Sequence, residues 1–183
     1  MNLQSRFRHV SPEVFHTRGG VETFSRQDVA DLRNEALKTQ RRRARLCAHA
    51  DATATLHEML IVHPRDAYVR PHLHRGKDES LVVIEGAVLF VHFDQDGKPT
   101  AAHHLAAAPS SHPFYLRTPT DTYHTLLIQS DWLTFLEITT GPFDRSGTIF
   151  APWSPQDDDA ASVQTYITEL TAKAMSLADN SHH

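Results

Sequence analysis

The sequence predicts a mainly β protein, a sandwich or barrel of short strands with one helix before it and one after it. Short apolar runs separated by turn residues fill the middle of the chain, and helical periodicity replaces them at both borders. The length of 183 residues is typical of one domain with a real core. We therefore expect an N-terminal helical extension packed on the barrel over residues 1–40, a barrel over 41–155, and a C-terminal helix and tail over 156–183.

Short apolar runs predict the strands of the barrel. Gly86 divides one long apolar stretch into two strands, and residues 94–97 are a run of hairpin-turn residues. Consecutive strands are then mostly antiparallel neighbours. The expected strands are 43–49, 56–63, 67–72, 80–85, 87–93, 99–106, 114–118, 123–129 and 132–139.

Capping residues predict where the two helices begin. Ser25 followed by Asp28 is typical of a helix start with a capping box, and apolar residues at helical spacing extend that helix over 26–39. Ser154 and Pro155 predict the start of a second helix, whose body we expect over 157–177. We expect the chain from Asp179 onward, with His182 and His183, to be frayed and to supply no ligand.

Composition argues against several classes of partner. The net charge of −4 and the pI near 6.4 give no reason to expect nucleic acid, and the one basic run, residues 41–45, is short. The single cysteine, Cys47, excludes an internal disulfide and indicates a reducing compartment. No apolar stretch approaches the roughly 18 to 20 residues that a membrane span needs. We therefore expect a cytoplasmic protein without a membrane partner.

A cluster of ligand-type residues predicts a metal site. His72 and His74 are two apart on a predicted strand, so both side chains leave the same face. With 14 histidines in 183 residues, one such pair is expected by chance. Glu79 and then Gly86 at set offsets make the pattern much more specific, and a later strand carries His124. Three imidazoles and a carboxylate suit one divalent ion of Fe, Zn, Ni, Mn or Co.

These residues resemble two known motifs. Residues 71–80 with Gly86 resemble the first cupin motif, and residues 119–124 resemble the second. Asp66 and Asp121 stand where those motifs usually have glycine. The resemblance implies a cupin double-stranded β-helix, or jelly-roll barrel, that holds its metal inside. It places the metal ligands at His72, His74, Glu79 and His124.

A longer match narrows the resemblance to the WbuC-type cupin metalloproteins. It runs from about Arg41 to Pro155 and includes the segments 41–49, 58–60, 68–72, 79–80, 93–94, 123–125, 141–143 and 150–155. Members of that family often sit among bacterial surface-polysaccharide genes, which implies a link to O-antigen biosynthesis. The family does not define a reaction.

Several basic residues are candidates for substrate binding. Arg43, Arg45 and His49 alternate along one face of a predicted strand, and two guanidinium groups facing the barrel interior would clamp a carboxylate or phosphate. The alternative is an edge strand protected by surface charge. Arg70 and Lys77, close to the histidine pair in sequence, complete the set of candidates.

Other polar residues have simpler interpretations. Cys47 is better explained as a small buried hydrophobic residue than as a nucleophile. Glu137, in an apolar strand, must be paired, protonated or turned to water, and pairing with a ligand histidine or with Arg43 is one option. The histidines without ligand spacing are expected at the surface, namely His57, His63, His92, His103, His104 and His112.

Three functions fit this sequence. The first is an enzyme whose metal acts as a Lewis acid in isomerisation, epimerisation or hydrolysis of a small anionic or sugar-derived substrate. The second is an Fe(II)-dependent dioxygenase, and the third is a non-catalytic binding or sensor cupin. No catalytic residue is assigned. Open sheet edges of such folds often pair across a two-fold axis, so we also expect a homodimer.

Overall fold

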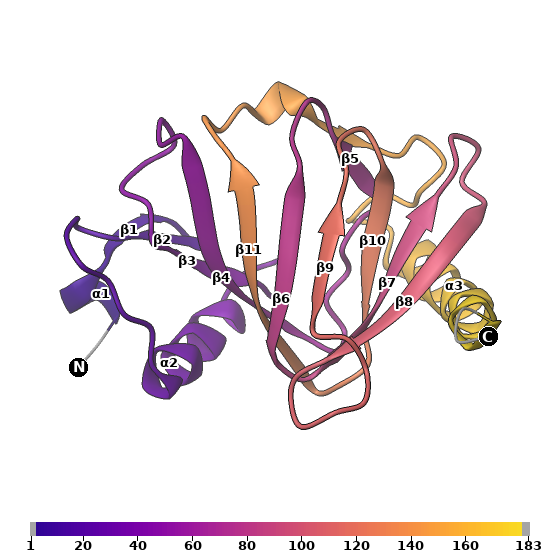
Figure 1. Ribbon diagram of the computed structural model, residues 1–183, viewed down its shortest axis with the longest axis horizontal. Helices are drawn as coiled ribbons and strands as arrows, with labels where there is room; N and C mark the ends of the chain where they lie inside the picture. The colour runs from indigo at the N-terminus through magenta and orange to yellow at the C-terminus, as the bar shows by residue number, and fades with distance from the viewer. Residues whose placement is uncertain (1–2, 181–183) are drawn as a thin grey trace.

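Two sheets form the body of the protein. The structure is a computed structural model, which describes residues 3–180. One sheet has seven strands in the order β1-β2-β3-β4-β11-β6-β9, and the other has five in the order β12-β5-β10-β7-β8. In Figure 1 the long strands of the two sheets converge at the bottom of the view and spread apart toward the top. This architecture is a jelly-roll barrel, which confirms the fold class predicted from the sequence.

The strands are short, and nearly all pair with antiparallel neighbours. Their bounds are β1 Arg8–Ser11, β2 Val14–His16, β3 Ala44–Cys47, β4 Leu56–Pro64, β5 His72–His74, β6 Glu79–Glu85, β7 Ala87–Phe93, β8 Pro99–Ala106, β9 Tyr115–Thr118, β10 Tyr123–Ile128, β11 Trp132–Thr140 and β12 Thr148–Phe150. The pair β2 and β3 is parallel. The helices are α1 Leu3–Arg6, α2 Arg26–Ala36, α3 Ala160–Asn180 and the 3-10 turn η1 Arg145–Gly147.

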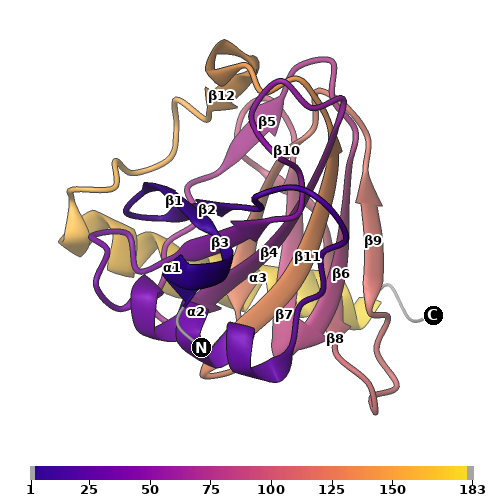
Figure 2. The same ribbon diagram turned by 90° about the vertical axis from the view of Figure 1, so that its left-hand side faces the viewer.

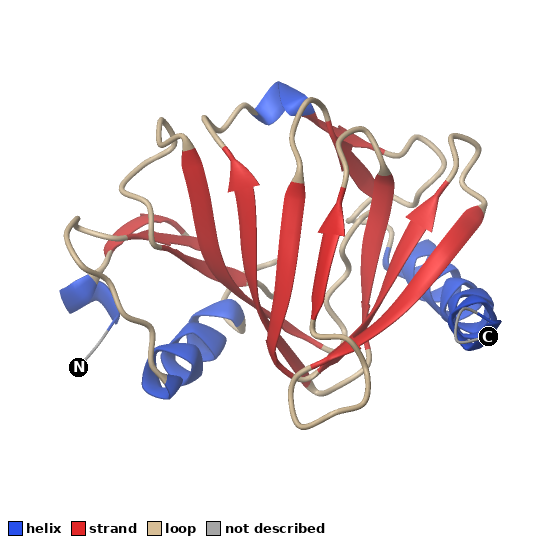
Figure 3. Ribbon diagram, viewed as in Figure 1, coloured by secondary structure: helices blue, strands red, loops and turns tan. Residues whose placement is uncertain are grey.

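Alternation along each strand separates an inner core from two outer layers. On β3 and β4, Cys47, Met59 and Ile61 belong to the inner core together with Phe135 of β11. Leu46 belongs to a separate layer beneath α2, and on the other sheet a third layer packs beneath α3. Figure 3 shows the two helices on the outside of the two sheets, and Figure 2 shows α1 and α2 close to the strands of the N-terminal segment. The inner face of β3 is therefore the face that carries Cys47.

The N-terminal segment does more than add a helix. It also supplies β1 and β2, which extend the seven-stranded sheet beyond β3. These strands and β12 have only three or four residues each, too few for a periodic pattern to be recognised in the sequence. β3 is therefore not an edge strand, because β2 pairs with one side of it and β4 with the other.

The predicted strand over 67–72 is wrong. Residues 67–71 are a loop, and β5 begins at His72. Pro71 has no N–H to donate to a neighbouring strand, and the carbonyl of Val69 accepts the Thr125 hydroxyl instead of a strand partner. The strands predicted over 87–93 and 99–106 are confirmed at both ends.

Side-chain caps mark the starts of α2 and α3. The cap of α2 is the predicted one, and the cap of α3 is not. Ser25 and Asp28 form the predicted capping box of α2, although that helix ends at Ala36 rather than at residue 39. The start of α3 was predicted too early: it begins at Ala160, after Asp159 accepts the Ser162 amide. Ser154 does not cap it, because its hydroxyl donates to the Ala151 carbonyl. Residues 179–180, where the tail predicted to fray begins, are the last two of α3, and residues 181–183 lie outside the described residues.

Candidate metal centre

Three histidines converge inside the barrel. His72 and His74 leave the same face of β5, and His124 lies opposite His72 in the pairing of β10 with β5. One ligand nitrogen from each of the three lies within 4.8 Å of those of the other two. Residues some fifty positions apart in sequence thus meet because β5 and β10 are neighbours in the five-stranded sheet.

Backbone carbonyls orient two of these rings. Nδ1 of His72 lies 2.8 Å from the Arg70 carbonyl, and Nδ1 of His124 lies 2.9 Å from the Thr122 carbonyl. A carbonyl only accepts, so each Nδ1 carries the ring proton, and each Nε2 keeps its lone pair for another partner. Ligand histidines are typically held in this way.

Glu79 supplies the carboxylate. Its Oε2 lies 3.3 Å from Nε2 of His74 and 3.7 Å from Nε2 of His124. Oε2 of Glu79 and Nε2 of His124 are both buried without a hydrogen-bond partner. Buried polar atoms are rarely left unsatisfied, and a cation between them would satisfy both, so these residues fit a metal ion.

Burial favours the neutral forms of His72 and His124. It lowers the pKa of His72 to about 3, with further lowering by the neighbouring His124 and His74. Burial also lowers the pKa of His124. Burial alone would raise the pKa of Glu79, but its close neighbours His74, His124 and His72 outweigh burial and lower this pKa. Neutral imidazoles and an ionised carboxylate are the protonation states that metal coordination requires.

A family model described as a domain of unknown function (DUF6016) matches residues 24–105. No curated protein matches the chain.

Several solved structures have a similar fold. A single-residue mutant of oxalate decarboxylase OxdC from Bacillus subtilis is 16% identical over 52% of this chain and 24% of that chain, with a TM-score of 0.44. KdgF from a Halomonas species is 15% identical over 57% of this chain and 83% of that chain, with a TM-score of 0.44. CapF, solved with the inhibitor 3-isopropenyl-tropolone, is 11% identical over 59% of this chain and 31% of that chain, with a TM-score of 0.48. The chain spans less than a third of the length of OxdC and CapF.

The sheet order and the pairing of His72 on β5 with His124 on β10 agree with the double-stranded β-helix that the two cupin motifs imply. The barrel has the cupin fold. Among residues 3–180, no helix is long and apolar enough to cross a membrane.

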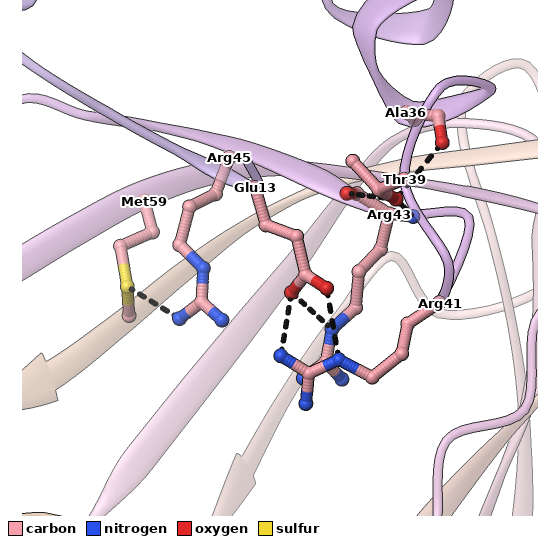
Figure 4. Close-up of polar contacts among 7 residues, drawn as sticks. All are labelled: Glu13, Ala36, Thr39, Arg41, Arg43, Arg45 and Met59. Carbon is pink, nitrogen blue, oxygen red and sulfur yellow. Dashed lines mark hydrogen bonds and ion pairs between the residues drawn. The ribbon is translucent and has the colours of Figure 1, made fainter. Parts of the chain in front are cut away.

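Arg45 lies on the inner face of β3 and Arg43 immediately precedes the strand, and the two arginines differ in their partners. Both alternate with Ala44 and Leu46, which pack beneath α2, and share their face with Cys47. Glu13 holds Arg43: Nε of Arg43 donates to its carboxylate at 3.1 Å, and Arg41 donates to the same group at 2.8 Å. Figure 4 shows the contacts of Glu13 with Arg41 and Arg43.

Arg45 has no carboxylate partner among the described residues. Its Nη1 donates to the Met59 sulfur at 3.7 Å, a weak contact that Figure 4 also shows. The half-buried Arg45 guanidinium is therefore the one of this pair whose donors remain open to a ligand.

The other candidates for substrate binding are elsewhere. Arg70 donates to Ser154 at 3.0 Å and to Gln156 at 2.6 Å. These hydrogen bonds hold the segment that follows β12 in place. Lys77, on a loop, donates to the Pro142 carbonyl at 2.5 Å. His49 is buried, and its Nδ1 accepts the Glu58 amide hydrogen at 3.1 Å. Each of these three side chains therefore already has a partner within the protein.

Two histidines predicted at the surface are buried, and that prediction was wrong. His57 and His63 are each only 4% exposed, because both occupy inward-facing positions of β4. His63 stacks on Phe135 with ring centroids 5.7 Å apart. Alternation with Met59 and Ile61 on β4 was the available signal, since apolar residues two apart mark the face that is buried.

Glu137 lies beside Glu79 on the inner side of β11. Burial and the Glu79 carboxylate raise its pKa to about 8, and Arg45 lowers it by a smaller amount. The expectation that Glu137 would be paired or protonated agrees with this position.

Proposed function

We propose that this cupin is a metal-dependent enzyme that acts on a small anionic molecule. Its metal ligands are His72, His74, Glu79 and His124. The observation that carries the proposal is the convergence of two buried atoms without hydrogen-bond partners, Oε2 of Glu79 and Nε2 of His124, beside the other two histidines.

The chemistry follows from this ligand set. A divalent ion held there would supply Lewis-acid polarisation of a substrate oxygen. Three neutral imidazoles and one carboxylate leave a net positive charge on such a centre, which favours an anionic ligand. The Arg70 and Thr122 carbonyls hold the His72 and His124 rings in place, so the ligand atoms are oriented before any ligand arrives.

Arg45 is the residue that we assign to the anionic group of the substrate. Its guanidinium is on the inner face of β3 and presents planar donors that fit a carboxylate or phosphate. Arg43 shares that face, but Glu13 already neutralises it. This reduces the predicted clamp of two arginines to one arginine.

The substrate class and the assembly extend the proposal. We assign a sugar-derived substrate, a link to surface polysaccharide synthesis and a cytoplasmic location on the resemblance to WbuC-type cupins. We also propose a homodimer, which is supported by large apolar side chains exposed around the β6 and β9 edge: Ile84, Phe114 and Tyr115. A monomer at micromolar concentration in size-exclusion chromatography would remove the dimer and leave the metal centre untouched.

Metal analysis tests the centre. Protein purified without chelators or added metal should hold a divalent ion, and His124→Ala should lose it from this centre. His103→Ala, which removes an exposed histidine on β8, should retain it. A His124→Ala variant that is folded and binds the ion as tightly as the parent would contradict the ligand assignment.

Turnover tests the reaction class. Metal-loaded protein should convert a member of a panel of uronic acids and sugar phosphates in D₂O, or introduce deuterium next to its carbonyl group, as observed by NMR. Turnover of these compounds only with iron and oxygen would favour the dioxygenase instead. Tight binding of an anion without any conversion would favour the non-catalytic function.

A further inference from the structure

A second group of ligand-type side chains lies apart from the centre described above. His16, Cys47 and His49 each place one ligand atom within 4.8 Å of those of the other two. All three residues are buried, with 8%, 2% and 8% of their surface exposed. His16 lies opposite Cys47 in the parallel pairing of β2 with β3, and His49 lies in the bend that follows β3.

The second group is well separated from Glu79. Strands β11 and β4 lie between β6, which carries Glu79, and β3. Three strand spacings amount to about 14 Å between the backbones. One ion cannot be shared by the two groups.

The His16 ring is already oriented as a ligand. Its Nδ1 lies 3.1 Å from the His49 carbonyl, which only accepts, so Nδ1 carries the proton. Nε2 of His16 therefore keeps a free lone pair. His72 and His124 are held by backbone carbonyls in the same way.

Cys47 needs a cation to become a thiolate. Burial raises the pKa of its thiol to about 12, so the thiol stays protonated at neutral pH without one. Two imidazole rings are unusual neighbours for a residue that only fills space, whereas N, S and N donors together suit Zn(II), Co(II) or Cu(I). Oxygen-seeking ions such as Mg(II) and Ca(II) do not match this set.

His49 makes the weakest ligand of the three. Its Nδ1 accepts the Glu58 amide hydrogen, so the free ring carries its proton on Nε2. Coordination through Nε2 requires the proton to move to Nδ1, with the loss of that hydrogen bond. The ring of His57, stacked at 4.0 Å, limits how far the His49 ring can turn.

We propose that His16, Cys47 and His49 form a second metal site, selective for soft or borderline ions. His16 and Cys47 are its main ligands, and His49 completes it at the cost of one hydrogen bond. The site binds more weakly than a four-ligand centre.

Cobalt distinguishes this site from the first one. Thiolate bound to Co(II) absorbs in the near ultraviolet, and Cys47 is the only cysteine in the chain, so this band can come from no other residue. Titration of the untagged, metal-free full chain with Co(II) should give the band and two ions per chain. Cys47→Ser should bind one ion without the band, and His72→Ala should keep the band with one ion fewer at the other centre.

Two variants test the histidines. His16→Ala should lower the apparent Co(II) affinity, read from the intensity of the band at limiting Co(II), by tenfold or more. His16→Gln keeps an amide donor for the His49 carbonyl, so it should lower the affinity by the same factor while it preserves the fold. His49→Ala should have the smaller effect. Absence of the band in folded parent protein at saturating Co(II), or an unchanged band in a folded His16→Gln variant, would overturn the proposal.

Discussion

Nε of Arg43 donates to Oε2 of Glu13 at 3.1 Å, and this contact separates the role of Arg43, just before β3, from that of Arg45 on the strand. Glu13 precedes β2, so the parallel pairing of β2 with β3 brings it to Arg43. Burial lowers the pKa of the Arg43 guanidinium, and the charges of Arg45 and Arg41 lower it further, whereas Glu13 opposes this effect. Arg43 is thus a paired structural cation, and Arg45 keeps its capacity for a ligand.

Arg45→Lys should weaken the binding of an anion more than Arg43→Lys does. The lysine keeps the charge but loses the planar fork, which we expect to lower affinity by about tenfold, the equivalent of one charge-assisted hydrogen bond. Isothermal titration of metal-loaded protein with citrate measures this difference. Arg43→Lys is the matched control, and equal losses in both variants would show that the two guanidinium groups act together after all.

Glu79→Gln should lower metal affinity while the fold survives. Glutamine is nearly isosteric with glutamate but removes the only carboxylate among the four proposed ligands, so we expect a loss of at least about tenfold. Glu169→Gln on α3, an exposed position, is the control and should leave the affinity unchanged. A competition titration with a chromophoric chelator reports both values, and an unchanged affinity in Glu79→Gln would remove Glu79 from the ligand set.

Gly86→Ala should destabilise the protein more than Gly76→Ala. Both glycines have positive φ, +87° and +65°, but an added Cβ at Gly86 would lie 2.2 Å from the Trp132 carbonyl oxygen, whereas nothing lies within 4 Å at Gly76. Backbone strain alone costs about 1–2 kcal/mol at either position. The clash at Gly86 adds to it, so urea denaturation should give a clearly larger loss in the free energy of unfolding there. Equal losses of unfolding free energy in the two variants would mean that the β6–β7 turn shifts enough to relieve the clash at Gly86.

Protonation of His63 should make folding sensitive to acid. Burial lowers its pKa in the folded protein to about 3, with smaller contributions from Arg43 and Arg45, whereas the unfolded chain has the ordinary value of 6.5. The unfolded state therefore binds the proton first as the pH falls. The stability that His63 contributes is complete above pH 6.5 and decreases toward pH 3, by about 2 kcal/mol at pH 5.

His63→Leu removes this proton-binding group. The difference in unfolding free energy between pH 7 and pH 5 should therefore be smaller in His63→Leu than in the parent, as measured by urea denaturation at both values. His103→Leu, at an exposed position of β8, should leave the difference as it is. An equal pH dependence in the parent and in His63→Leu would show that His63 is protonated in the folded state at pH 5.

The sequence by itself determined those features that depend on neighbours along the chain. The spacing of His72 and His74 places both on one face of a strand, Ser25 and Asp28 cap a helix, and Gly86 separates two strands, because each rests on local backbone geometry. The alternation of Arg43 and Arg45 likewise predicted that they share a face, although not which face is inside.

Only the tertiary structure decided which distant residues meet. The parallel pairing of β2 with β3 brings His16 to Cys47 and Glu13 to Arg43. A strand of three residues, such as β2, is too short for a periodic sequence pattern to predict this pairing. The inward turn of His57 on β4 depends on which side of the sheet α2 covers. These relationships arise from packing between segments far apart in the chain, and a local pattern carries no information about its partner across the barrel.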